Sequence, residues 1–589
     1  MKKLLAIILA VPLFFAVQSC EDFLDKIPEA DGLVEEDVFT DYLNFKRFLD
    51  RGYTWHHDYL NQFNQSMLAA ITDEGYTRSE WETMTIIGPG NWTSGFGAGG
   101  ATEWNTFEDA WLGIRVANMA LKNLPLLEES GGTSAQIDEL KGQAHFLRAW
   151  YYFDLFKRHG GMPYIEEVLE PDSEFNLPRL SYLETAQKIA ADADTAAGLL
   201  PEQWPQSDIG RANVGAALAI KSTALLYAAS PGPYRNTSND VALWEAAAQA
   251  AWDFIDYAET TGHYELMDGT STEDARWWTP GGEVTHTYPD DRVNVFMYTE
   301  PQDNTEIIYW HHQSLFQNKY VTFGVPSITS RGRMSGYSPT QNFVDRFEML
   351  DGYPIDESPM YDPADPYANR DPRFYQTILF NMRDWNEGAG GDDVYLQLYN
   401  GGRDRIAEQY YSYTGYLSNK YWDRNSNVTV DQNPPITYTI YFRYADILLQ
   451  YAEAANEVGG PNHTIAGATM SAADAVNMVR ARVDMPPIPP EYMNQDDFRE
   501  RVKNERAIEL FFENKRIFDL QRWGDLTNTE NTVLYGATIT ENTGSPIGYD
   551  VQQSTDPVVI RPYVDRHYLF PVPPIQASMY EAFDQNPGW

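Results

Sequence analysis

The sequence predicts a mainly α-helical protein whose paired helices form a superhelix, with a loop-rich insertion that contains short β elements. Three observations support this fold class. Apolar residues recur at steps of three and four residues in several long segments. Some of these segments are rich in Ala and Gly, so neighbouring helices can approach each other closely. A long stretch rich in Gly, Pro, Asp and Tyr interrupts the helical pattern.

The clearest predicted helix contains Leu140, Ala144 and Leu147 on one face and ends at Gly160-Gly161. Three more helices are predicted from the same periodicity: Ala212 to Ser230, Tyr444 to Val458, and Phe498 to Trp523. Further segments of similar composition run from Trp104 to Leu124, Tyr182 to Leu200, and Trp244 to Ala258. Their pairing suggests a tetratricopeptide-like superhelix with a degenerate repeat, because no fixed period of about 34 residues is present.

The predicted insertion spans about residues 269–437 and divides the helical body into about 104–268 and 438–525. Short β-like runs occur at Glu306 to Trp310 and, just beyond the insertion, at Tyr438 to Tyr444. Segments of this kind often carry function. We expect residues 20–589 to form one domain, joined to its anchor by a tether at 20–31.

The N-terminus has the pattern of an export signal. Lys2 and Lys3 precede an apolar stretch from Leu4 to Val17, which is the length of a signal-peptide core and too short to span a bilayer comfortably. The stretch leads to Cys20 in a lipobox-like context, so residues 1–19 are predicted to be removed. We expect Cys20 to carry lipid and to anchor the protein on the outer membrane, exposed at the cell surface.

Composition limits the possible functions. Cys20 is the single cysteine among 589 residues, so its acylation leaves no disulfide to stabilise the fold. The net charge of −42 repels phosphate backbones, which makes nucleic acid a poor partner. Aromatic residues make up 14% of the chain, and their rings suit sugar binding as well as core packing.

One acidic series resembles catalytic chemistry. Glu505, Glu509 and Glu513 follow one another at four-residue steps, but Arg506 and Arg516 are interleaved with them. A glycosidase also needs two carboxyl groups that face each other across the sugar. We therefore predict ion pairs that lock this region to the body, and no catalytic residues.

Other motifs are weak. The glycine-rich stretch Gly95 to Gly100 matches GxGxxG, but no strand precedes it, so a dinucleotide site is not expected. The pairs His56-His57 and His311-His312 do not form a zinc motif. No cofactor is expected. A structural calcium ion at the loop that contains Asp362, Asp365 and Asp371 is the one metal alternative, although the loop lacks an EF-hand glycine.

Eight segments, in order along the mature chain, resemble the SusD/RagB family of nutrient-binding lipoproteins. They read CEDFLDKIP, FLRAWYYFDLFKRHGGMPYI, ALAIKSTALLYAASP, SPTQNFVDRFEMLDG, RDPRF, RYADILLQYAEAANE, ERAIELFFENKRIFDLQRWG and QNPGW. The resemblance implies a SusD-like domain in which tetratricopeptide-like units support a variable ligand-binding face. It also implies a lid-like partnership with a SusC-type TonB-dependent outer-membrane transporter, and ligand binding without bond breaking.

Ligand contacts are predicted where exposed aromatic rings and hydrogen-bonding side chains occur together outside the helices. Two stretches have this composition, and the predicted contacts are Arg78, Trp81, Asn91 and Trp92 in the first and Trp310 and Tyr320 in the second. Trp277-Trp278 is a third, lower-ranked candidate.

Three classes of function are compatible with the sequence. The first is a glycan-binding lipoprotein that serves a TonB-dependent importer, with peptides as the alternative ligand. The second is a surface glycosidase, and the third is a scaffold that joins other proteins through its helical repeat.

Overall fold

The computed structural model describes residues 35–59, 67–76, 106–267, 272–289, 301–311, 338–384, 395–405, 412–421 and 438–589. Helices dominate these residues and the strands are short, which confirms the predicted mainly α fold class. The signal peptide, the tether and Cys20 lie outside the described residues, so their roles stay predictions. Among the described residues, no helix has both the length and the apolar character needed to cross a membrane.

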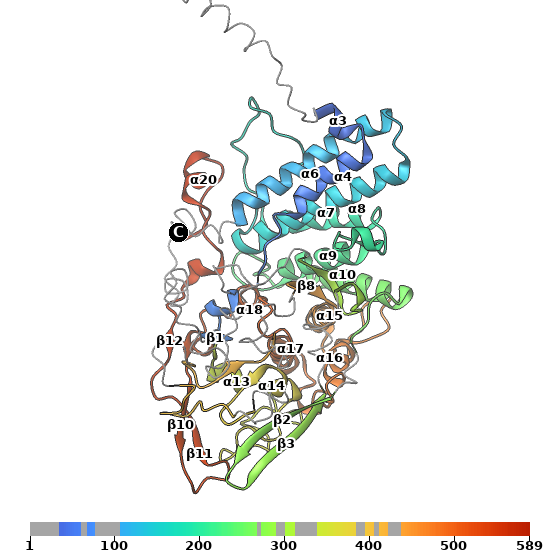
Figure 1. Cartoon of the computed structure of the whole chain (residues 1–589). Coiled ribbons are helices and arrows are strands. Elements are labelled where there is room, and N and C mark those ends of the chain that lie inside the picture. The colour runs from blue at the N-terminus through green and yellow to red at the C-terminus, as the bar shows by residue number, and fades with distance from the viewer. Residues whose placement is uncertain are drawn as a thin grey trace, which may run out of the picture.

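The N-terminal half is a stack of antiparallel helices. Each long helix packs against the next one in the sequence, as the blue to green ribbons of Figure 1 show. The helices of this half are α3 (Glu35–Phe39), α4 (Tyr42–Tyr53), α6 (Thr106–Glu129), α7 (Ser134–His159), α8 (Tyr182–Ala197), α9 (Val214–Ala229) and α10 (Val241–Thr261).

Local sequence signals explain where these helices begin and why they pack closely. Thr133 and Ser181 each start a helix with a capping box, in which their side chains accept a hydrogen bond from the backbone three residues later. At Gly113 on α6, a Cβ atom would lie 2.1 Å from the ring of Tyr151 on α7. Glycine at this position therefore allows the close contact between the two helices.

The C-terminal half continues the stack through α15 (Tyr444–Gly459), which packs against α10, α16 and α17. Helix α16 spans Ala472–Ala481, α17 spans Gln495–Glu509 and α18 spans Arg516–Trp523. The prediction of one helix from Phe498 to Trp523 was therefore wrong, because the chain breaks between α17 and α18.

Tertiary contacts explain this break. Phe512 and Asn514 both have positive φ angles of 61°, which a continuous helix cannot contain. The backbone N–H of Phe512 donates to the carboxylate of Glu74 at 2.7 Å, and the side chain of Asn514 accepts from the N–H of Leu68 at 2.8 Å. Both partners are more than 400 residues away, so helical periodicity alone could not reveal the interruption.

The strands form small two-stranded sheets within the described residues. The longest pair is the hairpin of β2 (Thr272–Thr279) and β3 (Gly282–Pro289), at the bottom of Figure 1. Strand β4 (Ile307–Trp310) pairs antiparallel with β8 (Ile440–Arg443), which leads directly into α15. The two β-like runs predicted from the sequence are thus hydrogen-bonded partners.

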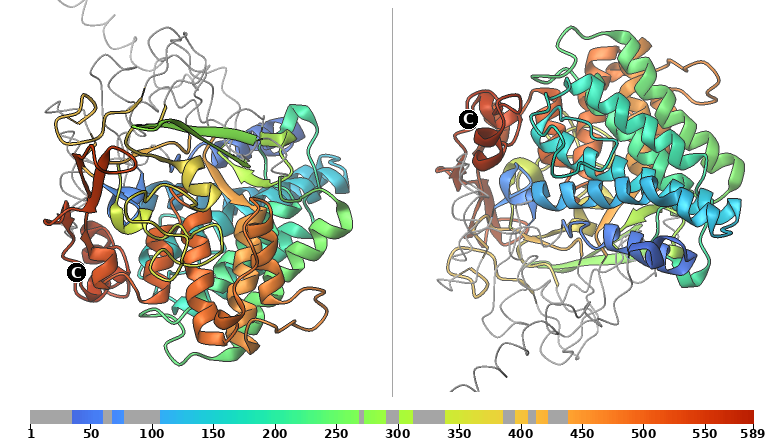
Figure 2. Two further views of the ribbon diagram at one scale, coloured as in Figure 1. Left: turned by 90° about the horizontal axis from the view of Figure 1, so that it is seen from below. Right: turned by 90° about the horizontal axis from the view of Figure 1, so that it is seen from above.

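The C-terminal segment returns to the first helices. It contains β10 (Ala537–Glu541), β11 (Tyr549–Gln553) and the short helix α20 (Pro574–Met579). The N–H of Phe570 donates to the carbonyl of Arg158 at the end of α7, and the side-chain amide of Asn586 donates to the carbonyl of His159. Both views in Figure 2 show this red segment beside the helical body.

Candidate functional site

The acidic series on α17 is part of a buried ion-pair network. Glu505 contacts Arg373 and Arg480, and Glu513 contacts Lys420 and Arg443 at 2.7 and 2.8 Å. All of these residues are at most 6% exposed. The prediction that these carboxylates make internal ion pairs is therefore confirmed for Glu505 and Glu513.

Glu509 lies at the centre of this network. Its carboxylate contacts Arg373 at 3.0 Å, Arg443 at 2.7 Å, and Arg482. Burial opposes ionisation, but the three guanidinium groups outweigh it and hold the pKa of Glu509 well below its usual range. A carboxylate that is permanently ionised and enclosed by arginines is suited to stabilising the fold rather than to proton transfer.

The motifs judged weak from the sequence also have structural roles. His56 stacks on Trp150 in the core, with ring centroids 4.7 Å apart. Asp371 caps α14 (Pro372–Thr377) and pairs with Arg373 at 2.8 Å, so its carboxylate is already used. Among the described residues, no group of three potential metal ligands occurs, and the loop at Asp362 to Asp371 does not gather its carboxylates. The glycine-rich stretch lies outside the described residues.

Most of the predicted ligand contacts also lie outside the described residues: Arg78, Trp81, Asn91, Trp92 and Tyr320. Two described residues that flank these contacts in the sequence, one before Arg78 and one after Tyr320, nevertheless pair with each other. In β1 (Gly75–Tyr76), Tyr76 pairs with Ser338 of β5 (Ser338–Pro339), and its ring lies 5.7 Å from that of Tyr413. The chain before residue 77 and the chain after residue 337 therefore meet at one place.

Trp310 is described, and it is the last residue of β4. Trp310 is partly exposed and pairs with Ile440 of β8. The next residue, His311, makes a hydrogen bond to the backbone carbonyl of His56. Trp310 thus lies at the edge of the aromatic core, where its ring is only partly available to a ligand.

The lower-ranked pair Trp277-Trp278 separates into two roles. Successive side chains of a strand point to opposite faces. Trp277 on β2 is 3% exposed and stacks on Tyr375, whereas Trp278 is 46% exposed. The ring of Trp278 lies 6.0 Å from that of Tyr395, whose hydroxyl donates to Glu283 at 2.6 Å. The exposed ring of Trp278, beside the partly exposed Tyr395 and a carboxylate, forms a described surface suited to sugar rings.

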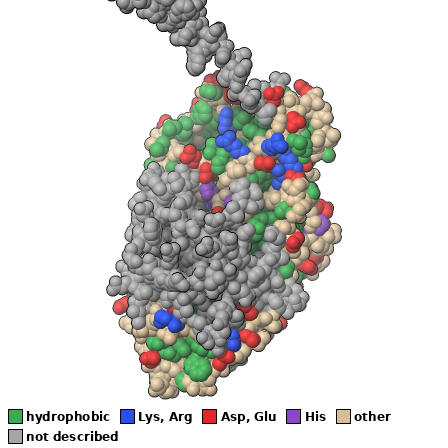
Figure 3. Space-filling model, viewed as in Figure 1, with side chains coloured by type: hydrophobic (Ala, Val, Ile, Leu, Met, Phe, Trp, Pro, Cys, Tyr) green, Lys and Arg blue, Asp and Glu red, His purple; other side chains and the backbone are tan. Residues whose placement is uncertain are grey.

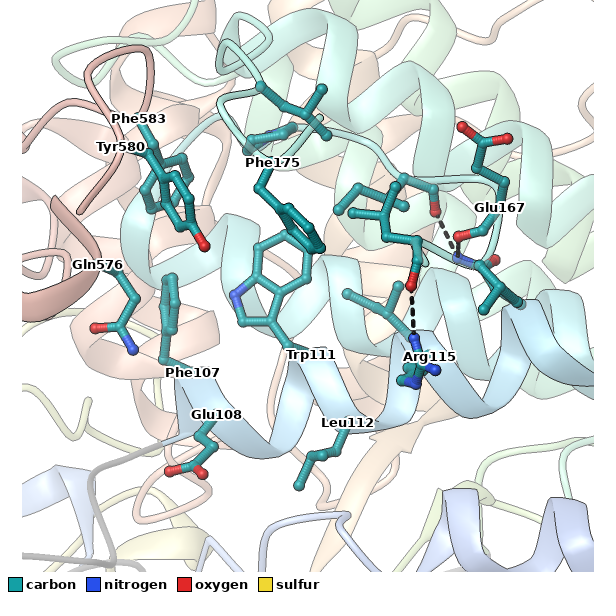
Figure 4. A pocket seen from close by; sticks show the side chains of 17 residues that line it. Phe107, Glu108, Trp111, Leu112, Arg115, Glu167, Phe175, Gln576, Tyr580 and Phe583 are labelled. Atoms are coloured by element: carbon teal, nitrogen blue, oxygen red, sulfur yellow. Dashed lines mark hydrogen bonds between the residues drawn. The ribbon is translucent and has the colours of Figure 1, made fainter. Parts of the chain in front are cut away.

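A pocket that the sequence did not predict lies between α6, the loop after α7 and the C-terminal segment. Its volume is about 500 Å³, and Figure 4 shows the rings that form its walls. They belong to Phe107, Trp111, Phe175, Tyr580 and Phe583. Figure 3 shows hydrophobic side chains at the surface in the upper part of the molecule, where Figure 1 places α6.

Only one feature of this pocket could have been recognised from residues that are close together in the sequence. Phe107 and Trp111 are four residues apart and share a face of α6, which the sequence indicates but which is equally typical of a core face. Tyr580 and Phe583 lie more than 450 residues later. Their meeting with α6 depends on the return of the C-terminal segment.

Stacked helices, with ion-paired carboxylates buried between them, define a mainly helical repeat fold. A family model described as the SusD family matches residues 295–589, and one described as starch-binding associating with outer membrane matches residues 22–226. The chain therefore belongs to the SusD family, as its motifs indicated.

Relatives agree with this assignment. SusD-like protein P2 of Formosa agariphila is 24% identical over 538 residues, which cover 89% of this chain and 86% of that protein. The crystal structure of a SusD-like protein from Bacteroides fragilis has a TM-score of 0.72 at 27% identity, and the match covers 94% and 99% of the two chains. A surface glycan-binding protein A from Bacteroides fluxus shares the fold, with a TM-score of 0.59 at 20% identity over 93% of this chain and 100% of that one.

Proposed function

We propose that this protein is a non-catalytic surface lipoprotein that binds oligosaccharides or polysaccharides and delivers them to a SusC-type TonB-dependent transporter. Membership of the SusD family carries the proposal, because one matching family model is described as starch-binding and one protein of similar fold is named a surface glycan-binding protein. The exposed ring of Trp278, next to the partly exposed ring of Tyr395, supports it with a surface that suits a sugar ring.

The contact residues form the second part of the proposal. Arg78, Trp81, Asn91, Trp92, Trp310 and Tyr320 remain the proposed ligand contacts. The pairing of Tyr76 with Ser338 supports this choice, because Tyr76 lies just before Arg78 and Ser338 is where the described chain resumes after Tyr320. Rings and hydrogen-bonding side chains from two stretches would then reach one ligand.

Binding to a panel of polysaccharides, measured by affinity gel electrophoresis and calorimetry, tests this proposal. We expect at least one glycan to bind, and Trp81→Ala and Trp92→Ala to weaken that binding. Peptide binding without glycan binding would instead favour peptide uptake. Release of reducing sugar from a bound glycan would identify a glycosidase and contradict the non-catalytic role.

The anchor requires a separate experiment. Because the expected role of Cys20 is to carry the lipid and not to contact ligand, Cys20→Ala should leave glycan affinity unchanged but abolish surface retention and uptake. Co-purification of the wild-type protein with a TonB-dependent transporter from solubilised outer membranes tests the partnership. Loss of glycan affinity in the Cys20→Ala protein would contradict the separation of anchor and binding site.

A further inference from the structure

A small cavity lies inside the protein where its N-terminal and C-terminal halves meet. Its volume is about 20 Å³, which is enough for one water molecule or one small ion. The walls come from α7, α9, β8, α18 and the chain between α17 and α18, in the middle of the molecule in Figure 1. The polar part of the lining includes Lys157, Tyr227, Asn514 and Lys515.

Lys157 brings a positive charge to this cavity. It is 4% exposed, donates to the hydroxyl of Tyr59 at 2.5 Å, and pairs with Asp154 at 2.8 Å. Asp154 also pairs with the guanidinium group of Arg158, so one carboxylate serves two cations. Because an ammonium group has three N–H groups, Lys157 retains one donor, and the cluster carries an excess of positive charge.

Lys515 is the second cation at the cavity. It donates to the carbonyl of Tyr441 at 2.7 Å and pairs with Asp446 at 3.1 Å, so it also retains one donor. Burial lowers the pKa of Lys157 to about 7, and the charge of Lys515 contributes to this decrease, although Asp154 opposes it. Two ammonium groups that destabilise each other's charge beside one cavity favour an anion in that cavity.

Two further donors in the lining have no partner among the described residues. The first is the hydroxyl of Tyr227, a residue that is 3% exposed. The second is the side-chain amino group of Asn514, which is 4% exposed. The amide oxygen of Asn514 accepts from the N–H of Leu68 at 2.8 Å, and this bond fixes which end of the amide donates.

The carboxylate in the lining is already occupied by other cations. Glu513 contacts Lys420 at 2.7 Å and accepts two hydrogen bonds from Arg443, both at 2.8 Å. A water molecule in the cavity would need acceptors for its own two hydrogens, whereas a small anion only accepts. The surplus of donors and of positive charge therefore favours an anion over water.

We propose that this cavity binds a small monovalent anion, of which chloride is the simplest example. Lys157, Lys515, Tyr227 and Asn514 donate to the anion, and its charge balances the excess of positive charge that Asp154 leaves. The anion bridges α7, α9 and the chain between α17 and α18, and so stabilises the contact between the two halves of the protein. This site is independent of the proposed glycan function.

Crystals of the full-length mature protein grown in sodium bromide identify the occupant. Bromide replaces chloride in most sites and has an anomalous signal. We expect an anomalous peak in the cavity, within hydrogen-bond distance of the ammonium groups of Lys157 and Lys515. Density in the cavity without this signal would identify a water molecule and overturn the proposal.

Thermal unfolding measures whether the anion matters in solution. The Tm should rise as sodium chloride replaces sodium gluconate at constant ionic strength, because chloride binds the folded protein and gluconate is too large for the cavity. A bromide peak without any dependence of the Tm on chloride would indicate an adventitious ion only, and it would also overturn the proposal.

Variants locate the effect. Tyr227→Phe removes one donor, so the chloride concentration that gives half of the rise in Tm should increase about ten-fold. Lys157→Met should abolish the rise, while Asp154 keeps Arg158 as its partner.

Tyr257→Phe is the matched control. The hydroxyl of Tyr257 on α10 is also buried without a partner among the described residues, but it does not line the cavity. This variant should respond to chloride as the wild type does. If Lys157→Met fails to fold, Tyr227→Phe decides alone, and a response of Tyr227→Phe equal to that of the control would refute the site.

Discussion

Charged side chains are usually associated with functional sites and apolar ones with the core, but two regions of this protein show the opposite arrangement. The α17–α18 region concentrates carboxylates and guanidinium groups, yet these are buried and paired with one another. The surface beside α6 is largely apolar, yet its rings line an open pocket. The comparison teaches that the availability of a group, more than its chemical reactivity, distinguishes a binding site from a structural element.

The largest expected effect is on the charged region. Glu509→Ala should destabilise the protein by about 3–5 kcal/mol, because it leaves Arg373, Arg443 and Arg482 buried without their shared carboxylate. Chemical denaturation of the two proteins measures the difference.

A matched control uses an exposed ion pair. Glu170 pairs with Lys122 at 2.9 Å on the surface, and Glu170→Ala should leave the denaturation midpoint unchanged. If the two variants behaved alike, the buried network would not have the structural importance that its geometry implies.

An intermediate effect concerns His159, where α7 meets the C-terminal segment. Burial, together with Arg158 and Arg179, lowers the pKa of His159 to about 3, so the folded protein keeps this ring neutral while the unfolded chain protonates it below about pH 6.5. Stability is therefore retained above that pH and lost as the pH falls. At pH 5 the loss should reach about 2 kcal/mol.

Urea denaturation at pH 7.5 and pH 5, with wild type and His159→Gln, measures this loss. The variant should lose less stability on acidification, because its side chain does not titrate. An identical pH dependence in both proteins would show that His159 does not contribute.

The smallest effect on stability is expected at the exposed residue Trp278 on the β2–β3 hairpin. Trp278→Ala should change the free energy of unfolding by less than about 0.5 kcal/mol, because the ring is 46% exposed. If the proposed glycan function is correct and the sugar reaches this surface, affinity should fall about three- to ten-fold. Trp277→Ala, in the core, should instead destabilise the protein. If Trp278→Ala were strongly destabilising and Trp277→Ala were not, the assignment of Trp277 as buried and Trp278 as exposed would be reversed.

Much of the fold could be predicted from the sequence because helix signals are local. Periodic apolar residues and end signals such as Gly160-Gly161 lie within the helices that they define, and the seven predicted segments each contain helix. The one incorrect helix prediction was a continuous helix from Phe498 to Trp523. It fails because Phe512 bonds to Glu74 and Asn514 bonds to Leu68, both more than 400 residues away. The ion pairing of Glu505, Glu509 and Glu513 could be predicted, but their partners Arg373, Arg443 and Arg482 lie outside the segment, so only the tertiary structure identifies them.

The sequence by itself determined the helical class, the family motifs and the structural role of the acidic series. Only the tertiary structure decided which tryptophan of the pair at 277 and 278 is exposed, and which rings meet beside α6. The physical reason is the distance along the sequence between the residues that must interact. A helix depends on neighbours within a few residues, whereas the pocket requires Trp111 and Tyr580 to meet through the folding of nearly the whole chain.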